Sequence, residues 1–289
     1  MAPLALRIMD GSAGTAEQAR PGQRKIRGIA CRIKHRPGLS LLDAMGHAIE
    51  EDGVASTSYE RIEAHDGGAF EAFCAAPDRQ SSPGVLLFQE IFGINDNIRG
   101  VAERLAAVGY LTLAPDMFWR IEPRFERNDD SALAECLAMV QQLDWAAAGA
   151  DITSTFAHLL AMPHCSGTVG GVGFCLGGTL TYLFATSSRV HGQGPDAAVS
   201  YYGSGIHQML DQANSIECPI MFHYGNHDPY IPQLQIAAVE AAVTQHPGAI
   251  VHRYDAGHGF SNWEAPSMYN KDSAELAWER TLEFFARHL

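Results

Sequence analysis

The feature of this sequence that most directly suggests chemistry is a cysteine between glycines. Gly173, Cys175 and Gly177 form a G-x-C-x-G pattern. Residues 169–174 before the cysteine predict a strand, and residues 177–187 predict a helix. A nucleophile on such a sharp strand-to-helix turn stands above the sheet, where the helix N-terminus favours a thiolate. The pattern alone also fits a buried, inert cysteine beside tightly packed glycines.

Two further polar residues follow predicted strands later in the chain. Asp228 comes after residues 219–224, and His258 comes after residues 250–254. Each has an ordinary explanation by itself, since Asp before Pro is common turn chemistry and the chain has 13 histidines. Together with Cys175 they follow the order nucleophile, acid, histidine. We therefore expect a Cys-His-Asp triad at the carboxyl edge of a sheet, where open α/β sheets bind ligands.

An enzyme that attacks a carbonyl with a thiolate also needs donors for the negative oxygen that forms. The residue after the nucleophile, Leu176, would supply one backbone N–H. The second donor should come from the loop after an earlier strand. The apolar run at residues 85–88 predicts that strand and nominates the N–H of Ile91. Each such donor is worth roughly 3 kcal/mol in the transition state.

The elements that must position these residues alternate between strand and helix patterns, which is typical of βαβ units and a mostly parallel sheet covered on both faces. The turn sequence His65-Asp66-Gly67-Gly68 adds an antiparallel hairpin at the start. We predict an α/β class with the α/β-hydrolase fold. The expected strands are residues 59–64, 69–75, 85–88, 110–114, 169–174, 197–202, 219–224 and 250–254, and the expected helices are residues 98–108, 131–143, 146–162, 177–187, 233–245 and 273–288.

Several segments, in one order, resemble the dienelactone hydrolases (carboxymethylenebutenolidases). They are Gln-Glu-Ile-Phe-Gly at 89–93, Gly-Phe-Cys-Leu-Gly-Gly at 173–178, Tyr-Tyr-Gly at 201–203, Asp228-Pro229, and Ala-Gly-His at 256–258. The resemblance covers about residues 55–289. It implies a carboxylic ester hydrolase that opens an enol-lactone in bacterial aromatic degradation. It also implies that Glu90 faces the resting thiol, and that substrate displaces it and helps to generate the thiolate. A loop carboxylate or a helix cap is the alternative.

The sequence departs from this family where two arginines are expected to hold a substrate carboxylate. Asn262 stands at one expected position, and the region of Leu133 has no arginine at the other. Without them, bidentate recognition of a carboxylate is lost, and the cavity suits a less charged ester, lactone or thioester. Three arginines that could substitute lie upstream, at Arg120, Arg124 and Arg127. Candidate substrate-binding residues are Phe92, Trp119, Arg120 and Tyr201, and Trp145 is a further candidate for the pocket wall.

Three functions remain open at this point. The first is hydrolysis of a dienelactone-like lactone or ester through a thioester acyl-enzyme. The second is a thioesterase or general carboxylesterase that acts on a less charged acyl substrate. The third is a non-enzymatic binding or redox-sensing module in which Cys175 is an oxidisable thiol. The order of the three polar residues favours an enzyme.

Composition limits the partners of the chain. A net charge of −13 over 289 residues disfavours nucleic acid, and no apolar run is long enough to predict a membrane span. The six cysteines form no CxxC pair or zinc spacing. We expect a cytoplasmic protein with free thiols, a small-molecule substrate, no metal or organic cofactor, and a monomeric or small homo-oligomeric state.

The first part of the chain differs from the rest. Residues 1–54 are basic, rich in Gly and Pro, and without a sustained period. We predict a poorly ordered extension there, with a short helix near residues 41–50 as an option. A transit peptide and a flexible extension without function are both compatible with this composition. Residues 55–289 are the predicted hydrolase domain.

Overall fold

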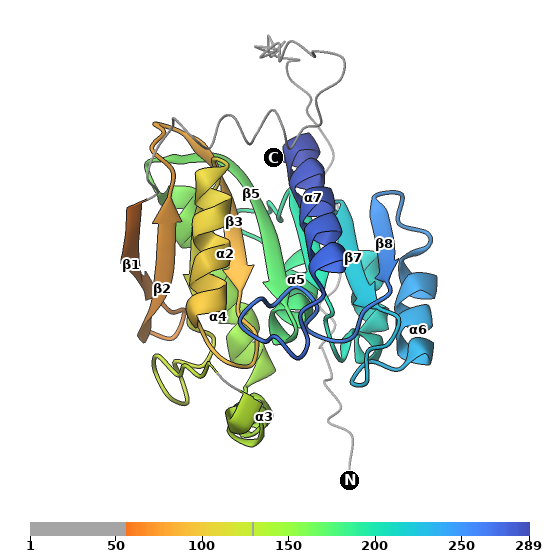
Figure 1. Cartoon of the computed structure of the whole chain (residues 1–289). Coiled ribbons are helices and arrows are strands. Elements are labelled where there is room, and N and C mark those ends of the chain that lie inside the picture. Colours follow the sequence, from red (N-terminus) through yellow and green to blue (C-terminus); the bar gives the residue numbers. More distant parts are fainter. Residues whose placement is uncertain (1–55, 129) are drawn as a thin grey trace, which may run out of the picture. The chain divides into compact units, whose positions relative to one another are not determined.

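A single eight-stranded sheet organises the protein (Figure 1). The computed structural model describes residues 56–128 and 130–289. The strand order is β1-β2-β4-β3-β5-β6-β7-β8. β1 pairs antiparallel with β2, and β2 pairs antiparallel with β4, whereas all other neighbours are parallel. The predicted α/β class, the mostly parallel sheet and the N-terminal antiparallel hairpin are confirmed.

The strands are β1 Ser56–Glu63, β2 Ala69–Ala76, β3 Ser82–Phe88, β4 Leu111–Pro115, β5 Cys165–Phe174, β6 Ala197–Tyr201, β7 Ile220–Gly225 and β8 Ala249–Tyr254. The α-helices are α2 Asp96–Ala107, α3 Leu133–Gln141, α4 Trp145–Ala161, α5 Leu176–Ser187, α6 Gln233–Val243 and α7 Lys271–His288. Short 3-10 helices occupy Asp130–Ala132, Ile206–Gln208 and Leu210–Ser215.

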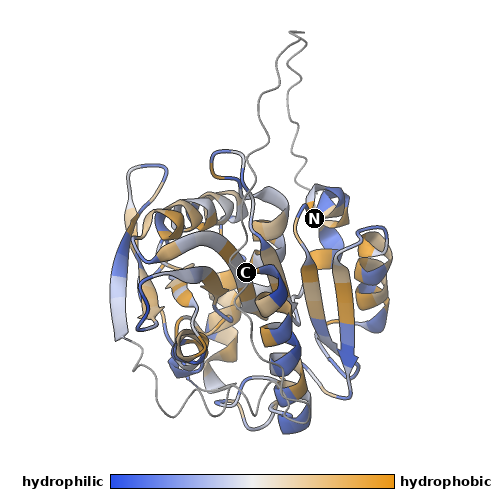
Figure 2. Ribbon diagram, turned by 90° about the horizontal axis from the view of Figure 1, so that it is seen from above, coloured by the Kyte–Doolittle hydropathy of each residue, from blue (hydrophilic) through white to orange (hydrophobic). Residues whose placement is uncertain are grey.

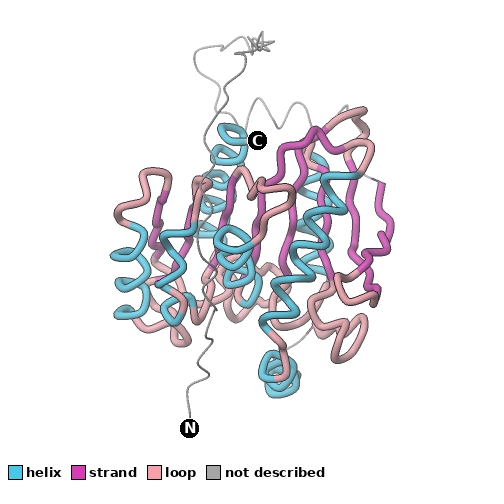
Figure 3. The backbone as a smooth tube through the Cα atoms, turned by 180° about the vertical axis from the view of Figure 1, so that it is seen from behind, coloured by secondary structure: helices cyan, strands magenta, loops and turns pink. Residues whose placement is uncertain are grey.

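The helices lie on both faces of the sheet. α2 and α7 lie in front of the sheet in Figure 1, and α4, α5 and α6 lie in front of it when it is seen from behind in Figure 3. Figure 2 shows hydrophobic residues concentrated on the central strands and on the inward sides of the helices. Strands covered on both faces read as continuous apolar runs, and every residue of β4 and β7 is buried.

Side-chain caps define where three of the helices begin. Asn95 accepts a hydrogen bond from the N–H of Ile98 at the start of α2, and Asp144 accepts from the first turn of α4. Asn270 does the same for α7 through Ser273. Asn and Asp are strongly preferred at this position because they satisfy an N–H that has no intrahelical acceptor.

Every strand and helix expected between residues 59 and 288 is present, with shifted ends. β5 begins at Cys165, four residues before the predicted start, because Ser82 of β3 pairs with Cys165 and extends the ladder. The short 3-10 helices after β6 carry no sustained apolar period and were not expected. The optional helix near residues 41–50, and the whole predicted extension at residues 1–54, lie outside the described residues. Among the helices that the structure describes, none has the length and hydrophobicity to cross a membrane.

Candidate active site

Cys175 occupies a strained turn between β5 and α5. Its backbone has φ 55° and ψ −115°, a conformation that is costly for a residue with a side chain. The N–H of Cys175 donates to the carbonyl of Tyr201, 3.0 Å away, and this bond ties the turn to the end of β6. A strained residue between a strand and a helix is the geometry of a nucleophile elbow.

The flanking glycines are required by close backbone contacts. A Cβ placed on Gly173 would lie 2.1 Å from the carbonyl oxygen of Gly177. A Cβ on Gly177 would lie 2.1 Å from the carbonyl oxygen of Phe88 in β3. Both distances are far below any tolerated contact, and the opposing atoms are backbone. Only glycine therefore fits at these two positions, where α5 packs closely against β5 and β3.

His258 and Asp228 meet at the carboxyl edge of the sheet, as the sequence predicts. Nδ1 of His258 lies 2.7 Å from Oδ2 of Asp228. The other carboxylate oxygen, Oδ1, accepts from the N–H groups of Tyr230 and Ile231 at 2.8 and 3.0 Å. The Asp228 side chain is fully buried. Asp228 is thus held rigidly, and it fixes both the orientation and the tautomer of the imidazole.

The electrostatics of His258 favour its charged form. Burial lowers the pKa of this imidazole, but the charge interaction with Cys175 and the hydrogen bond to Asp228 outweigh it. A hydrogen bond to Cys175 adds to these effects, and the pKa rises from 6.5 to about 10. These two neighbours therefore favour the protonated imidazole at neutral pH.

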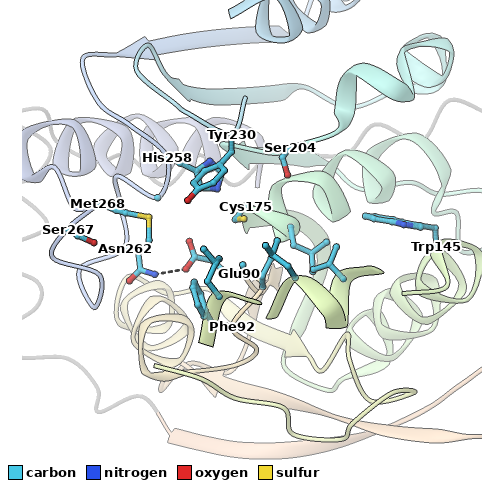
Figure 4. A pocket seen from close by; sticks show the side chains of 16 residues that line it. Glu90, Phe92, Trp145, Cys175, Ser204, Tyr230, His258, Asn262, Ser267 and Met268 are labelled. Atoms are coloured by element: carbon cyan, nitrogen blue, oxygen red, sulfur yellow. Dashed lines mark hydrogen bonds between the residues drawn. The ribbon is translucent and has the colours of Figure 1, made fainter. Parts of the chain in front are cut away.

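Figure 4 shows the carboxyl group of Glu90 near Cys175, where it is bonded to Asn262. Its Oε2 accepts from the side-chain amide of Asn262, and its Oε1 accepts from the hydroxyl of Tyr202 at 3.3 Å. Glu90 is 3% exposed. Burial raises the pKa of Glu90 above its ordinary value, and the charge on His258 and the two hydrogen bonds only partly offset this effect. Asn262, which stands where the family resemblance predicts an arginine, thus binds the Glu90 carboxyl group through a neutral amide.

Two backbone N–H groups border the same cavity as the sulfur. Leu176 is the first residue of α5, so its N–H has no intrahelical acceptor. Ile91 lies in the turn after β3, and no backbone acceptor within the described residues receives its N–H. Both residues line the cavity beside Cys175. A backbone N–H group without an acceptor beside a nucleophile is the kind of donor that binds an oxyanion.

The cavity around Cys175 has a volume of about 410 Å³ and is mostly apolar. One wall comes from Leu133, Leu137 and Val140 of α3, with Trp145 beyond them. The remaining lining residues are Glu90, Ile91, Phe92, Cys175, Leu176, Ser204, Tyr230, His258, Gly259, Asn262, Ser267 and Met268. The sequence nominated Phe92 and Trp145 for this wall. It did not identify the α3 residues, Tyr230 or Met268.

Three other candidates for substrate binding lie away from the cavity. Trp119 stacks on Phe70 and donates from its indole N–H to Asp151. Arg120 forms a two-pronged ion pair with the same Asp151. Tyr201 is buried, with its hydroxyl 2.6 Å from Oγ1 of Thr281. The structure therefore gives these three residues packing and hydrogen-bonding partners outside the pocket of Cys175.

Comparison with known proteins places this geometry in a family. The model of the dienelactone hydrolase family matches residues 70–289. A carboxymethylenebutenolidase of Pseudomonas sp. (strain P51) is 34% identical over 228 residues, which cover 78% of this chain and 93% of the relative. Carboxymethylenebutenolidase 1 of Cupriavidus pinatubonensis is 32% identical over 237 residues, which cover 81% and 96%.

Solved structures give the same result. A provisionally assigned dienelactone hydrolase from Klebsiella pneumoniae superimposes with a TM-score of 0.70 at 28% identity, and the match covers 80% of this chain and 98% of that one. The esterase Pf2001 of Pyrococcus furiosus, at 16% identity and a TM-score of 0.59, shares the fold. The chain belongs to the dienelactone hydrolase family, whose members are lactone and ester hydrolases of the α/β-hydrolase superfamily.

Proposed function

We propose that this hydrolase cleaves its lactone or ester through Cys175, with His258 and Asp228 as partners and a thioester acyl-enzyme as the intermediate. The observation that carries the proposal is the contact between His258 and Asp228, 2.7 Å apart. This contact orients the imidazole so that the ring can form a hydrogen bond with Cys175, which lies on a strained turn. A nucleophile, a base and a group that orients the base form the arrangement used for acyl transfer.

In the acylation step, the thiolate of Cys175 attacks the carbonyl carbon. The N–H groups of Ile91 and Leu176 hold the oxyanion of the tetrahedral intermediate. The intermediate collapses when the bond between carbon and the leaving oxygen breaks. That oxygen takes the proton of His258, and in a lactone it remains attached to the acyl group. The products of this step are a thioester and a neutral imidazole.

In the deacylation step, the neutral His258 takes a proton from water while the hydroxide adds to the thioester carbon. The second tetrahedral intermediate expels the thiolate of Cys175, which regains its imidazolium partner. Each cycle consumes one water and releases a carboxylic acid. Asp228 orients the imidazole throughout and stabilises its charged form.

We assign Glu90 to the resting state of the enzyme. Its carboxyl group lines the same cavity as the sulfur, and Tyr202 and Asn262 hold it there. A carboxyl group whose pKa is raised by burial is a better proton acceptor than an ordinary carboxyl group. In this proposal, entry of the substrate displaces Glu90 from the sulfur and helps to generate the thiolate, as the family resemblance implies.

A histidine titration tests the coupling on which the mechanism depends. The negative charge of Cys175 is the largest influence that raises the pKa of His258. Cys175→Ala is therefore expected to lower this pKa, so that the imidazole loses its proton at a lower pH than in the wild type. NMR of protein with ¹⁵N-labelled histidine reports both the pKa and the tautomer. The same pKa in both proteins would mean that no thiolate faces the ring.

A further inference from the structure

We propose that the substrate carries an uncharged, apolar acyl group, which binds against α3 and Trp145. The proposal rests on Cys175 being the nucleophile, and it adds the class of acyl group. It excludes an acyl group with a free carboxylate as the preferred substrate.

One side of α3 is apolar and faces the cavity. Leu133, Leu137 and Val140 are spaced i, i+4 and i+7, so they form one stripe along the helix. This stripe lines the cavity, whereas Cys136 and Met139 are buried on a neighbouring face. Where α3 borders the cavity, its second apolar face is therefore not covered by described residues of the chain.

Two large apolar side chains that line the cavity are exposed to solvent. Leu137 is 46% exposed and Trp145 is 40% exposed, although both are large and apolar. Their surfaces are continuous with the cavity that contains the sulfur. An apolar acyl chain attached to Cys175 would remove this surface from water, which is favourable.

The position of His258 sets the directions of the leaving group and the acyl group. Because His258 gives its proton to the leaving oxygen, the leaving group lies on the imidazole side of Cys175, and the acyl group points away from it. Figure 4 shows Trp145 on the opposite side of Cys175 from Met268 and Asn262, with His258 close to the sulfur. The side left for the acyl group is therefore the side of α3 and Trp145.

The described part of the cavity lining offers no Lys or Arg to a charged acyl group. No Lys or Arg is among the described residues that line the cavity, whose acidic member is Glu90. The arginines before α3 are paired elsewhere: Arg120 with Asp66 and Asp151, Arg124 with Glu71, and Arg127 with Glu135. His258, the cation among the described lining residues, lies on the side of the leaving group. A carboxylate on an acyl group at the α3 wall would therefore lose its hydration without gaining a cation there, and this costs free energy.

A matched pair of esters tests the inference. p-Nitrophenyl pentanoate and mono-p-nitrophenyl succinate have the same leaving group and similar acyl lengths, but only the succinate is charged. We expect kcat/KM to be roughly 100-fold higher for the pentanoate, from the cost of burying an unpaired charge. Equal turnover, or a preference for the succinate, overturns the inference. Acylation of Cys175 by the succinate would leave the proposed mechanism intact, whereas loss of hydrolysis of both esters would remove both proposals.

Variants of the wall locate the effect. Leu137→Asp is expected to lower kcat/KM for the pentanoate about tenfold, mostly through KM, because it puts a charge where the apolar chain binds. Leu276→Asp is the control, since Leu276 is 41% exposed on α7 and does not line the cavity. Leu133→Arg should raise turnover of the succinate about tenfold by supplying a cation. Equal effects of Leu137→Asp and Leu276→Asp would contradict the assignment of this wall.

Discussion

Replacing Cys175 with alanine is expected to lower kcat/KM for an activated ester by roughly 10⁴- to 10⁶-fold, because removal of the nucleophile abolishes the covalent route. The remaining rate would come from the oxyanion donors and the pocket alone. The measurement is steady-state release of p-nitrophenol by purified wild type and variant. Circular dichroism spectra of the two proteins should coincide, since alanine is smaller than cysteine and fits the same turn.

Cys165→Ala is the matched control for this prediction. Cys165 is the first residue of β5, and Cys175 directly follows the last residue of the same strand. Both are free thiols at the two ends of β5, but of the two only Cys175 lines the cavity. The Cys165 variant should retain near wild-type activity. A Cys175→Ala variant that folds and keeps full activity would remove the thiol from the mechanism.

Changing Asp228 to asparagine is expected to lower kcat about 10⁴-fold, as the corresponding change does in serine proteases. The amide can still accept from the N–H groups of Tyr230 and Ile231, so the loop should keep its shape. Its NH₂ group, however, can only donate to Nδ1 of His258. The wrong tautomer then faces the sulfur, and the imidazolium loses its counter-charge. Pre-steady-state kinetics would show slower acylation with little change in KM.

The chain contains a second Asp–His pair that serves as a control. Asp255 lies 2.6 Å from Nε2 of His227, and their side chains are 93% and 69% exposed. An exposed pair of this kind contributes little to stability and has no contact with the cavity. Asp255→Asn should therefore leave kcat close to the wild-type value. A similar loss in both variants would show that Asp228 acts through general charge or stability rather than through His258.

The sequence predicted the parts of the site that backbone geometry dictates. The turn at Cys175 needs glycine at Gly173 and Gly177, because each lies against a backbone carbonyl. This requirement leaves a readable pattern in the sequence. The positions of Asp228 and His258 could be predicted equally well. Parallel strands end at one edge of the sheet, so the loops after them must meet there.

Side-chain partners that are distant in sequence could not be predicted. Nothing near Arg120 indicates that Asp66 and Asp151 neutralise it, at separations of 54 and 31 residues. The bond between Asn262 and Glu90 joins residues 172 positions apart. The sequence therefore identified the substitution at Asn262 but could not show which group this residue binds.

The wall of the cavity was missed for a different reason. A helix with apolar residues at helical spacing is normally interpreted as packing with all of them on the core. In α3, Cys136 and Met139 do this, whereas Leu137 faces the cavity. Periodicity gives the faces of a helix but does not reveal which face meets protein and which meets a ligand.

The most direct test of the central claim is the mass of the enzyme caught during turnover. Wild-type protein is mixed with p-nitrophenyl pentanoate, quenched in acid within milliseconds, and analysed intact and after proteolysis. We predict one added pentanoyl group per chain, attached to Cys175 and released by hydroxylamine. Acylation of Ser204 or Ser267, the two serines that line the cavity, would contradict the account. Turnover with no adduct, together with retained activity of Cys175→Ala, would also contradict it.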